Sequence, residues 1–339
     1  MLSLPRKIIG KTIIISPLNW GLGHASRIVP IIDLLKNNNK VIIAGEHPSL
    51  EFLQNRFPYL EFYEIGKTSF SFSPNFFQPT NLIRFYKYIK KTIEEEKIQA
   101  ENLSNRLNAD IIISDNRYGF YDKNKTSIII THQLTLKTPF GTIFDIATRS
   151  VIKNFLKHFD EIWIPDNLQI KLAGNLSKNY IGKKAKYIGI LSRFCLKSSI
   201  KETTEKKYKF CIILSGPEPS RSILEKKIIE TVSNIKYKTI IIAGNTKRKV
   251  SFNSGNIEYL SLADDKTLLD ALKDSENIII TAGYSSIMDM FCLKKKVFLI
   301  PTPKQTEQEY LAKYLSKKNP SMYTYLSEQN LHILNFIVD

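Results

Sequence analysis

The chain of 339 residues is 43% hydrophobic and carries a formal net charge of +17. This length exceeds one comfortable hydrophobic core and predicts two domains, and no apolar run approaches the roughly 20 residues that span a bilayer. The three cysteines lack Cys-x-x-Cys spacing, so we expect buried thiols of a reducing compartment, and neither disulfides nor a zinc site. No long apolar segment follows the basic N-terminal residues, and we therefore expect a cytoplasmic protein without a signal peptide.

The first predicted unit is a strand, a glycine turn and a helix. Apolar residues predict a strand over 12–16, the sequence Gly-Leu-Gly-His occupies 21–24, and a helical pattern covers 28–35. Glycines let the backbone approach a ligand closely, and a helix N-terminus favours negative charge. The spacing differs from the G-x-G-x-x-G of dinucleotide-binding turns. The turn is therefore either a ligand site of another kind or a packing device.

Apolar runs alternate with helical patterns along the rest of the chain, which is typical of βαβ units and a mostly parallel sheet. In the first domain the further strands are predicted over 41–44, 60–64, 111–114, 127–131 and 161–164. A second series follows the charged, turn-prone segment 197–209, with strands predicted over 210–214, 239–243, 257–260, 278–281 and 297–300. We therefore place an N-terminal domain at 1–195 and a C-terminal domain at 205–325, and we expect a last segment, 326–339, to pack back on the N-terminal domain.

Two apolar segments lie between the third and fourth predicted strands. Four phenylalanines stand among polar and proline residues over 70–79. They predict either an apolar lip that contacts a lipid or a hydrophobic acceptor, or a long loop folded back over the sheet. The following residues recur at helical spacing and predict a helix with its aromatic side chains in the core: Leu82, Phe85, Tyr86, Ile89 and Ile93.

The excess of basic residues is concentrated in the first 200 residues. A basic surface attracts anionic lipid headgroups, nucleic acid or polyanionic substrates. The alternative is that most of these lysines are only solvated, because the whole chain is rich in Lys, Ile and Asn. The basic runs are scattered and no recognisable nucleic-acid module occurs, so we expect no nucleic-acid partner. Peripheral contact with an anionic membrane, on the inner face of the plasma membrane, remains an expectation.

Polar side chains follow the ends of three strands in the first domain, and ligands of open α/β sheets bind beyond such carboxyl ends. Asn19, His24 and Arg27 follow the first strand, Asp115 follows the strand over 111–114, and His132 follows the strand over 127–131. An imidazole near its ordinary pKa of about 6.5 is suited to taking a hydroxyl proton. We expect an acceptor site here with His24 or Asp115 as the base. The alternative is that Asp115 and His132 only bond each other or nearby backbone to hold the loops.

In the second domain the strand over 278–281 leads into a turn and a helix that Ser285 or Ser286 would cap. Free N–H groups at the start of that helix suit a diphosphate. Asp289 can accept two hydrogen bonds from a ribose diol, and Glu307 and Gln308 can bind sugar hydroxyls. The alternative is that Asp289 only benefits from the helix dipole and that Glu307 and Gln308 begin a solvated helix.

Another turn follows the strand over 210–214. It contains Ser215 and Gly216, and Ser220 is expected to cap the next helix. Arg221 either neutralises a phosphate or lies exposed on the helix surface.

Together these turns resemble the GT-B glycosyltransferases, specifically the family 28 type that includes the GlcNAc transferase of peptidoglycan lipid synthesis. The N-terminal resemblance covers about 13–35, with Gly21 and Gly23 in a G-x-G-H turn, and the C-terminal resemblance covers about 268–315. The latter comprises the turn at Gly283, a downstream acidic residue, a proline after the next strand and an acidic-Gln pair. The chain has Asp289 where the family usually has Glu, Ala-Gly where it has Gly-Gly, and Tyr-Leu-Ala where Asn-Ala commonly follows the Gln.

The resemblance implies an α/β fold of the GT-B type, in which two Rossmann-like domains with mostly parallel sheets face each other across a cleft. It implies inverting transfer of a hexose or N-acetylhexosamine from a nucleotide sugar, expected to be UDP-linked, to a cell-envelope glycan or a lipid-linked sugar. We expect no cofactor and no metal, because no Asp-x-Asp pair occurs. The expected catalytic residues are His24 and Asp115, and Asn19, Arg27 and His132 are expected at the acceptor. The expected donor residues are Gly21, Gly23, Ser215, Gly216, Arg221, Gly283, Ser285, Ser286, Asp289, Glu307 and Gln308.

Two other functions stay open from the sequence. A nucleotide-sugar hydrolase of the GT-B type would release free sugar and nucleotide without an acceptor. A non-catalytic protein that binds a nucleotide or a polyanion would use the surplus positive charge, and its binding would weaken as salt is raised.

Overall fold

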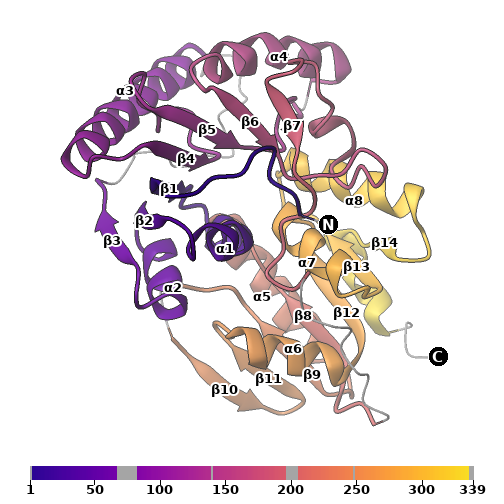
Figure 1. Ribbon diagram of the computed structural model, residues 1–339. Helices are drawn as coiled ribbons and strands as arrows, with labels where there is room; N and C mark the ends of the chain where they lie inside the picture. The colour runs from indigo at the N-terminus through magenta and orange to yellow at the C-terminus, as the bar shows by residue number, and fades with distance from the viewer. Residues whose placement is uncertain (1, 67–81, 139, 196–204, 247–248, 336–339) are drawn as a thin grey trace. The chain divides into compact units, whose positions relative to one another are not determined.

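The computed structural model describes residues 2–66, 82–138, 140–195, 205–246 and 249–335 (Figure 1). The chain divides into two compact units, Met1–Arg193 and Phe194–Asp339. The phenylalanine-rich segment 70–79 lies outside the described residues, as do the side chains of Leu82, Phe85 and Tyr86. Ile89 and Ile93, on the predicted helix, are half-buried.

The first unit is built on a seven-stranded parallel sheet. Its strand order is β3-β2-β1-β4-β5-β6-β7. Strands at the middle of such a sheet are covered on both faces and therefore read as continuous apolar runs, as the fully buried Ile13, Ile14 and Ile15 illustrate. The strands are β1 Thr12–Pro17, β2 Lys40–Gly45, β3 Glu61–Glu64, β4 Ile111–Asp115, β5 Thr126–Ile130, β6 Glu161–Ile164 and β7 Ala185–Tyr187.

Helices cover both faces of this sheet (Figure 1). Ala100 and Leu103 of α3 pack on Ile14 and Ile112 of the sheet, while Ile152 of α4 belongs to a neighbouring apolar cluster under β5 and β6. The two covered faces explain why the chain alternates between buried strands and amphipathic helices. The helices are α1 Leu22–Leu35, α2 Ser49–Arg56, α3 Leu82–Arg106 and α4 Thr142–Leu156, with a short 3-10 turn, η2, at Gly174–Leu176.

The second unit repeats this architecture with strand order β10-β11-β9-β8-β12-β13-β14. All its pairings are parallel except the antiparallel pair of β10 and β11. The strands are β8 Tyr208–Ile213, β9 Thr239–Ile242, β10 Ser251–Ser254, β11 Ile257–Leu260, β12 Ser275–Thr281, β13 Val297–Ile300 and β14 Tyr323–Tyr325. The helices are α5 Ser220–Val232, α6 Asp265–Lys273, α7 Tyr284–Cys292 and α8 Thr306–Lys318, and η3 Glu328–Asn335 is a 3-10 helix.

Both predicted helix caps in the second unit are wrong. α7 begins at Tyr284 with Gly283 in the N-cap position, so Ser285 and Ser286 lie inside its first turn. α5 begins at Ser220 with Pro219 as its N-cap residue. Neither N-cap residue, Pro219 or Gly283, makes a side-chain capping hydrogen bond, and the serines expected as caps lie within the helices.

The C-terminal segment was expected on the N-terminal domain. Instead, Leu326, Leu331 and Leu334 belong to the apolar core of the second unit, together with Leu224 and Ile228 of α5. The segment 326–335 thus completes the core of the unit to which it is joined.

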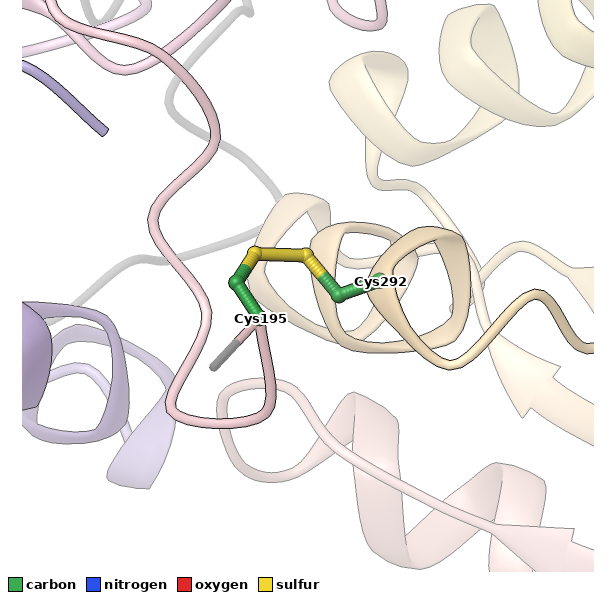
Figure 2. Close-up of a disulfide and its surroundings, with 2 residues drawn as sticks. All are labelled: Cys195 and Cys292. Atoms are coloured by element: carbon green, nitrogen blue, oxygen red, sulfur yellow. A yellow bond between two sulfur atoms is a disulfide. The ribbon is translucent and has the colours of Figure 1, made fainter. Parts of the chain in front are cut away.

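The prediction of three free thiols is wrong for two of the cysteines. Cys195 and Cys292 form a disulfide with their Cα atoms 4.9 Å apart (Figure 2), a separation within the normal disulfide range. The two residues are 97 positions apart in the sequence, so spacing alone gave no sign of their proximity. Cys211 is free and buried, and burial raises the pKa of its thiol to about 12.

Candidate active site

The candidate site of the first unit lies where the strand order changes direction. β1 lies between β2 and β4, and Pro17 at the end of β1 pairs with Asp115 at the end of β4. The chain turns from β1 into α1, while β4 continues into the loop after Asp115. In open α/β sheets ligands bind beyond the strand ends at such a switch point. The fold therefore brings α1 and the end of β4 to one place.

The glycine turn sets the position of His24. Gly21 has φ 71°, a left-handed conformation that favours glycine, and no neighbouring atom lies within 4 Å of a Cβ added there. α1 starts at Leu22, earlier than predicted, so His24 is the third residue of the helix. The Nδ1 atom of His24 lies 2.9 Å from Oδ2 of Asp115. The two residues predicted to share the catalytic role are thus in direct contact.

Arg27, on the next turn of α1, binds the same Asp115 carboxylate. Its Nε and Nη2 donate to Oδ1 of Asp115 at 2.8 and 2.5 Å. The Arg27 side chain is 2% exposed and that of Asp115 is 0% exposed, whereas that of His24 is 14% exposed. Arg27 was predicted at the acceptor, and the structure places it in a buried ion pair behind His24.

Burial and the Arg27 charge lower the pKa of His24, and the carboxylate of Asp115 opposes this effect. At Asp115 burial acts to raise the pKa, but the adjacent Arg27 and His24 hold it below its ordinary value. Asp115 is therefore ionised and only accepts hydrogen bonds, so His24 must donate through Nδ1. A neutral His24 then carries its lone pair on Nε2, which is the state that a general base requires.

The other two predicted acceptor residues have different surroundings. His132 is 3% exposed, and its Nδ1 lies 3.4 Å from Nη1 of Arg27. Asn19 binds the connection between β2 and α2, donating to the His47 carbonyl at 2.7 Å and accepting from the Ser49 hydroxyl at 2.8 Å.

A buried charge cluster beside this site was not predicted. Arg117, two residues after Asp115, lies 3.3 Å from Oε1 of Glu46 and 3.0 Å from Oε1 of Glu96. Burial raises the pKa of Glu96, while the Arg117 charge opposes the rise. Arg117 and Glu46 each follow a strand end, which is a recognisable signal, whereas Glu96 lies in a charged run of a long helix and gives none.

In the second unit, four of the predicted donor residues come together at the switch between β8 and β12. The hydroxyls of Ser215 and Thr281 are hydrogen-bonded at 2.6 Å. A Cβ added to Gly283 would lie 3.3 Å from Oγ of Ser215. Gly216 has φ 130°, and a Cβ there would lie 3.7 Å from Nε2 of Gln308. The end of β8, the start of α7 and the start of α8 therefore meet at one edge of this sheet.

Thr302 was missed as a member of this group. Its backbone N–H donates to Oε1 of Gln308 at 2.8 Å, which fixes the side-chain amide of a residue that is 7% exposed. Glu307 is half-buried in the first turn of α8. Asp289 is buried in the second turn of α7, beyond the half-buried Ser285 and Ser286.

The prediction that Arg221 is exposed or free to bind phosphate does not match its surroundings. The side chain is 2% exposed and donates to Glu218 at 2.8 Å and Glu225 at 2.5 Å. It also donates to the Ala243 carbonyl at 2.9 Å, after the end of β9. Arg221 thus ties the start of α5 to the sheet, and two carboxylates balance its charge.

Comparison with known proteins agrees with this architecture. Residues 221–338 match the family model described as glycosyl transferase family 1. A search of curated protein sequences gave no match. The model that matches is not that of the family 28 type which the motifs resemble, so the finer family assignment stays a proposal.

Solved glycosyltransferase structures match nearly the whole chain. The spinosyn rhamnosyltransferase SpnG complexed with thymidine diphosphate has a TM-score of 0.62 at 11% identity, covering 96% of this chain and 91% of that one. The glycosyltransferase SnogD from Streptomyces nogalater has a TM-score of 0.57 at 11% identity, covering 97% and 91%. Acinetobacter baumannii MurG has a TM-score of 0.51 at 11% identity, covering 96% and 89%. These likenesses confirm the predicted GT-B fold.

Across the described part of the chain, every helix is too short or too polar to cross a membrane.

Proposed function

We propose that this chain is a glycosyltransferase that moves a hexose or N-acetylhexosamine from a nucleotide sugar to an acceptor hydroxyl. The GT-B fold and the glycosyl transferase family 1 match over 221–338 support this proposal. The observation that carries it is the contact between His24 and Asp115 at the switch point of the first sheet. A buried carboxylate that fixes the tautomer of a neutral imidazole is a known arrangement for deprotonating a hydroxyl.

The second unit is the proposed donor domain. The first turn of α7 offers backbone N–H groups that no intrahelical acceptor uses, and these suit a diphosphate. Gly283 begins this helix, and Ser285 and Ser286 lie half-buried in the same turn. We assign the ribose to Asp289 and the sugar hydroxyls to Glu307 and Gln308. UDP is the proposed nucleotide, on the resemblance to the family 28 type.

The proposed chemistry is a direct displacement at the anomeric carbon. Nε2 of His24 takes the proton of the acceptor hydroxyl, and the acceptor oxygen forms its bond to the anomeric carbon. The bond from that carbon to the nucleoside diphosphate breaks at the same time, and the nucleoside diphosphate leaves with the bonding pair. Attack opposite the leaving group inverts the anomeric configuration. Asp115 stabilises the imidazolium of His24, and the helix start at Gly283 stabilises the departing negative charge.

We further propose that no metal ion is required, since the helix dipole and N–H groups supply the stabilisation of the diphosphate. EDTA should therefore leave transfer unchanged, and a loss of activity restored by Mg²⁺ would refute this part of the proposal.

A cell-envelope glycan or a lipid-linked sugar is the proposed acceptor, reached by peripheral contact with an anionic membrane. The supporting observation is an exposed apolar face on and before α4, where Ile143 is 82% exposed. Basic side chains, Lys153 and Lys157, are exposed at the end of the same helix, and such a combination suits an anionic lipid surface. The exposed apolar residues are Phe140, Ile143, Phe144, Ile146 and Val151.

The proposed donor class can be tested by thermal unfolding with UDP, GDP, dTDP and CMP and their common sugars, without metal. A ligand that binds only the folded protein raises the midpoint by mass action. We expect a shift with UDP and its sugars that Asp289→Ala abolishes. A matched control is Asp270→Ala, which changes an exposed carboxylate of α6. If none of these nucleotides or sugars shifts the unfolding midpoint at low salt, the proposed donor site is contradicted.

A further inference from the structure

We propose that Arg27 is a positioning residue for the base, because its guanidinium keeps Asp115 charged and oriented so that His24 presents Nε2 to the acceptor. This inference rests on the proposed role of His24. Arg27 itself does not touch the reacting atoms in this assignment, since it lies behind the carboxylate.

The geometry divides the carboxylate of Asp115 between two partners on one helix face. Oδ2 is 2.9 Å from Nδ1 of His24, and Oδ1 accepts from Nε and Nη2 of Arg27 at 2.8 and 2.5 Å. His24 and Arg27 are three residues apart on α1, a spacing that places both side chains on the same side of a helix. Two donors on one oxygen hold the carboxylate plane in place, so that the second oxygen faces the imidazole.

Charge balance gives Arg27 a role beyond orientation. Asp115 is 0% exposed, and an unpaired carboxylate at such a site would gain much by forming an ion pair with a protonated imidazole. Arg27 supplies the positive charge instead. The charged or titratable groups that act on His24 are Arg27, Asp115 and His132. Arg27 and Asp115 together are neutral, so His24 can remain neutral and free to accept a proton.

His132, two residues after the end of β5, contacts the same arginine. Its Nδ1 is 3.4 Å from Nη1 of Arg27, and because a guanidinium only donates, the Nδ1 of His132 must be the acceptor. The proton of a neutral His132 is then on Nε2. Nδ1 thus plays opposite parts in the two histidines, as a donor to Asp115 in His24 and as an acceptor from Arg27 in His132.

The test is a ¹⁵N NMR titration of the histidine side chains in the full-length protein, which has only five histidines. His24→Gln and His132→Gln assign the two signals. In the unaltered protein we expect His24 as the neutral Nδ1–H tautomer at pH 7. The opposite tautomer at His24 would overturn the proposal without any further variant.

Two substitutions separate charge from packing. Arg27→Met should raise the pKa of His24 by about one pH unit or more, because a nearby positive charge is removed. Arg27→Lys keeps that charge and should leave the pKa of His24 close to the original value. If Arg27→Met folds and the pKa of His24 does not rise, Arg27 is only a packing residue and the proposal fails.

These measurements need no acceptor and no donor, so they stand apart from the proposed function. If the expected tautomer and pKa rise occur but no sugar is transferred, the proposed function fails and the role of Arg27 in preparing His24 stands. If transfer occurs while the tautomer differs from that expected, the positioning role alone is overturned.

Discussion

The proposed catalysis depends on one hydrogen bond, between Nδ1 of His24 and the carboxylate of Asp115. General acid–base catalysis contributes about 10²–10⁴-fold to a rate. Asp115→Asn should therefore lower kcat by about 10²–10³-fold, since an amide does not stabilise the imidazolium and can impose the other tautomer. The measurement is steady-state kinetics with the identified donor and acceptor.

A matched variant controls for the buried site. Asp122→Asn changes another buried carboxylate of the first unit. Asp122 accepts a hydrogen bond from the Ser104 hydroxyl, and both residues are distant from His24 in the sequence. We expect it to affect stability more than kcat. Equal losses of kcat in both variants would show that Asp115 acts only through the fold.

The pH dependence follows from the direction of the His24 pKa. Burial and Arg27 lower this pKa below its ordinary value, and the base acts when it is deprotonated. The ordinary pKa of an imidazole is about 6.5. The rate should therefore remain high as the pH falls through that value, and should decline only at more acid pH. In Arg27→Met the acid limb should move to higher pH. An acid limb above about pH 7 in the unaltered protein would contradict the assignment of His24 as a neutral base.

The connection between β13 and α8 depends on Gln308. Its Oε1 accepts from the backbone N–H of Thr302 at 2.8 Å, and removing a buried acceptor costs about 1–3 kcal/mol. Gln308→Ala should lower the free energy of unfolding by that amount. Gln308→Glu keeps an acceptor oxygen for the Thr302 N–H but loses the amide N–H₂, so it should weaken donor binding. Chemical denaturation and nucleotide titration measure the two effects.

The contact between α3 and the loop after β4 depends on Gly119. A Cβ added there would lie 2.3 Å from the Ile93 carbonyl oxygen and 2.6 Å from its Cα. Because backbone atoms must then move, Gly119→Ala should destabilise the protein by about 1–3 kcal/mol. The control is Gly66→Ala, whose Cβ would meet only the flexible end of Gln99 at 3.1 Å. Similar melting temperatures for the two variants would contradict this account of the contact.

Strands at the centre of each sheet were predictable because burial on both faces produces continuous apolar runs. β4 shows this pattern and matches its predicted range to within one residue, whereas β8 and β12 begin two and three residues before their predicted starts. β7, β10 and β14 were missed. β7 and β14 have three residues each, and all four residues of β10 are exposed. Short edge strands are defined by pairing with a neighbour, which no local pattern records.

The residues at the strand ends of the candidate site were predictable, but their contacts were not. His24 and Asp115 follow strand ends, and parallel strands deliver such residues to one edge. Their pairing with Arg27 was not predictable, because it depends on the start of α1 at Leu22 and on the side-chain directions that follow. The predicted caps at Ser220 and Ser285 were wrong for a related reason. The N-cap residues are Pro219 and Gly283, and neither makes a side-chain capping hydrogen bond.

The chain has two α/β units, each with its candidate residues at a switch point, and the strand order of the second sheet follows that of the first when the antiparallel strand β10 is left out. The disulfide between Cys195 and Cys292 lies in the second unit. Alkylation of the unfolded, unreduced protein should therefore label one cysteine, Cys211, and all three should react after reduction. Labelling of three cysteines before reduction, measured by mass spectrometry, would contradict the disulfide.

Membrane contact is also a property of the whole protein. Ile143→Ser combined with Phe144→Ser should reduce co-sedimentation with vesicles that contain phosphatidylglycerol, because it removes exposed apolar area from α4. The control is Ile223→Ser, which changes an exposed apolar residue of α5. Equal binding by all three proteins would place any membrane contact elsewhere.

The proposed glycosyl transfer can be measured as the transfer of label from UDP-[¹⁴C]GlcNAc and UDP-[¹⁴C]glucose into lipid-extractable or polymeric material of a bacterial membrane fraction. The unaltered protein should transfer label and release UDP, and His24→Ala should lower transfer by about 10²-fold or more while still binding UDP. Transfer by His24→Ala at the unaltered rate would remove the proposed base. Release of free labelled sugar at the same rate with and without the membrane fraction would show hydrolysis in place of glycosyl transfer.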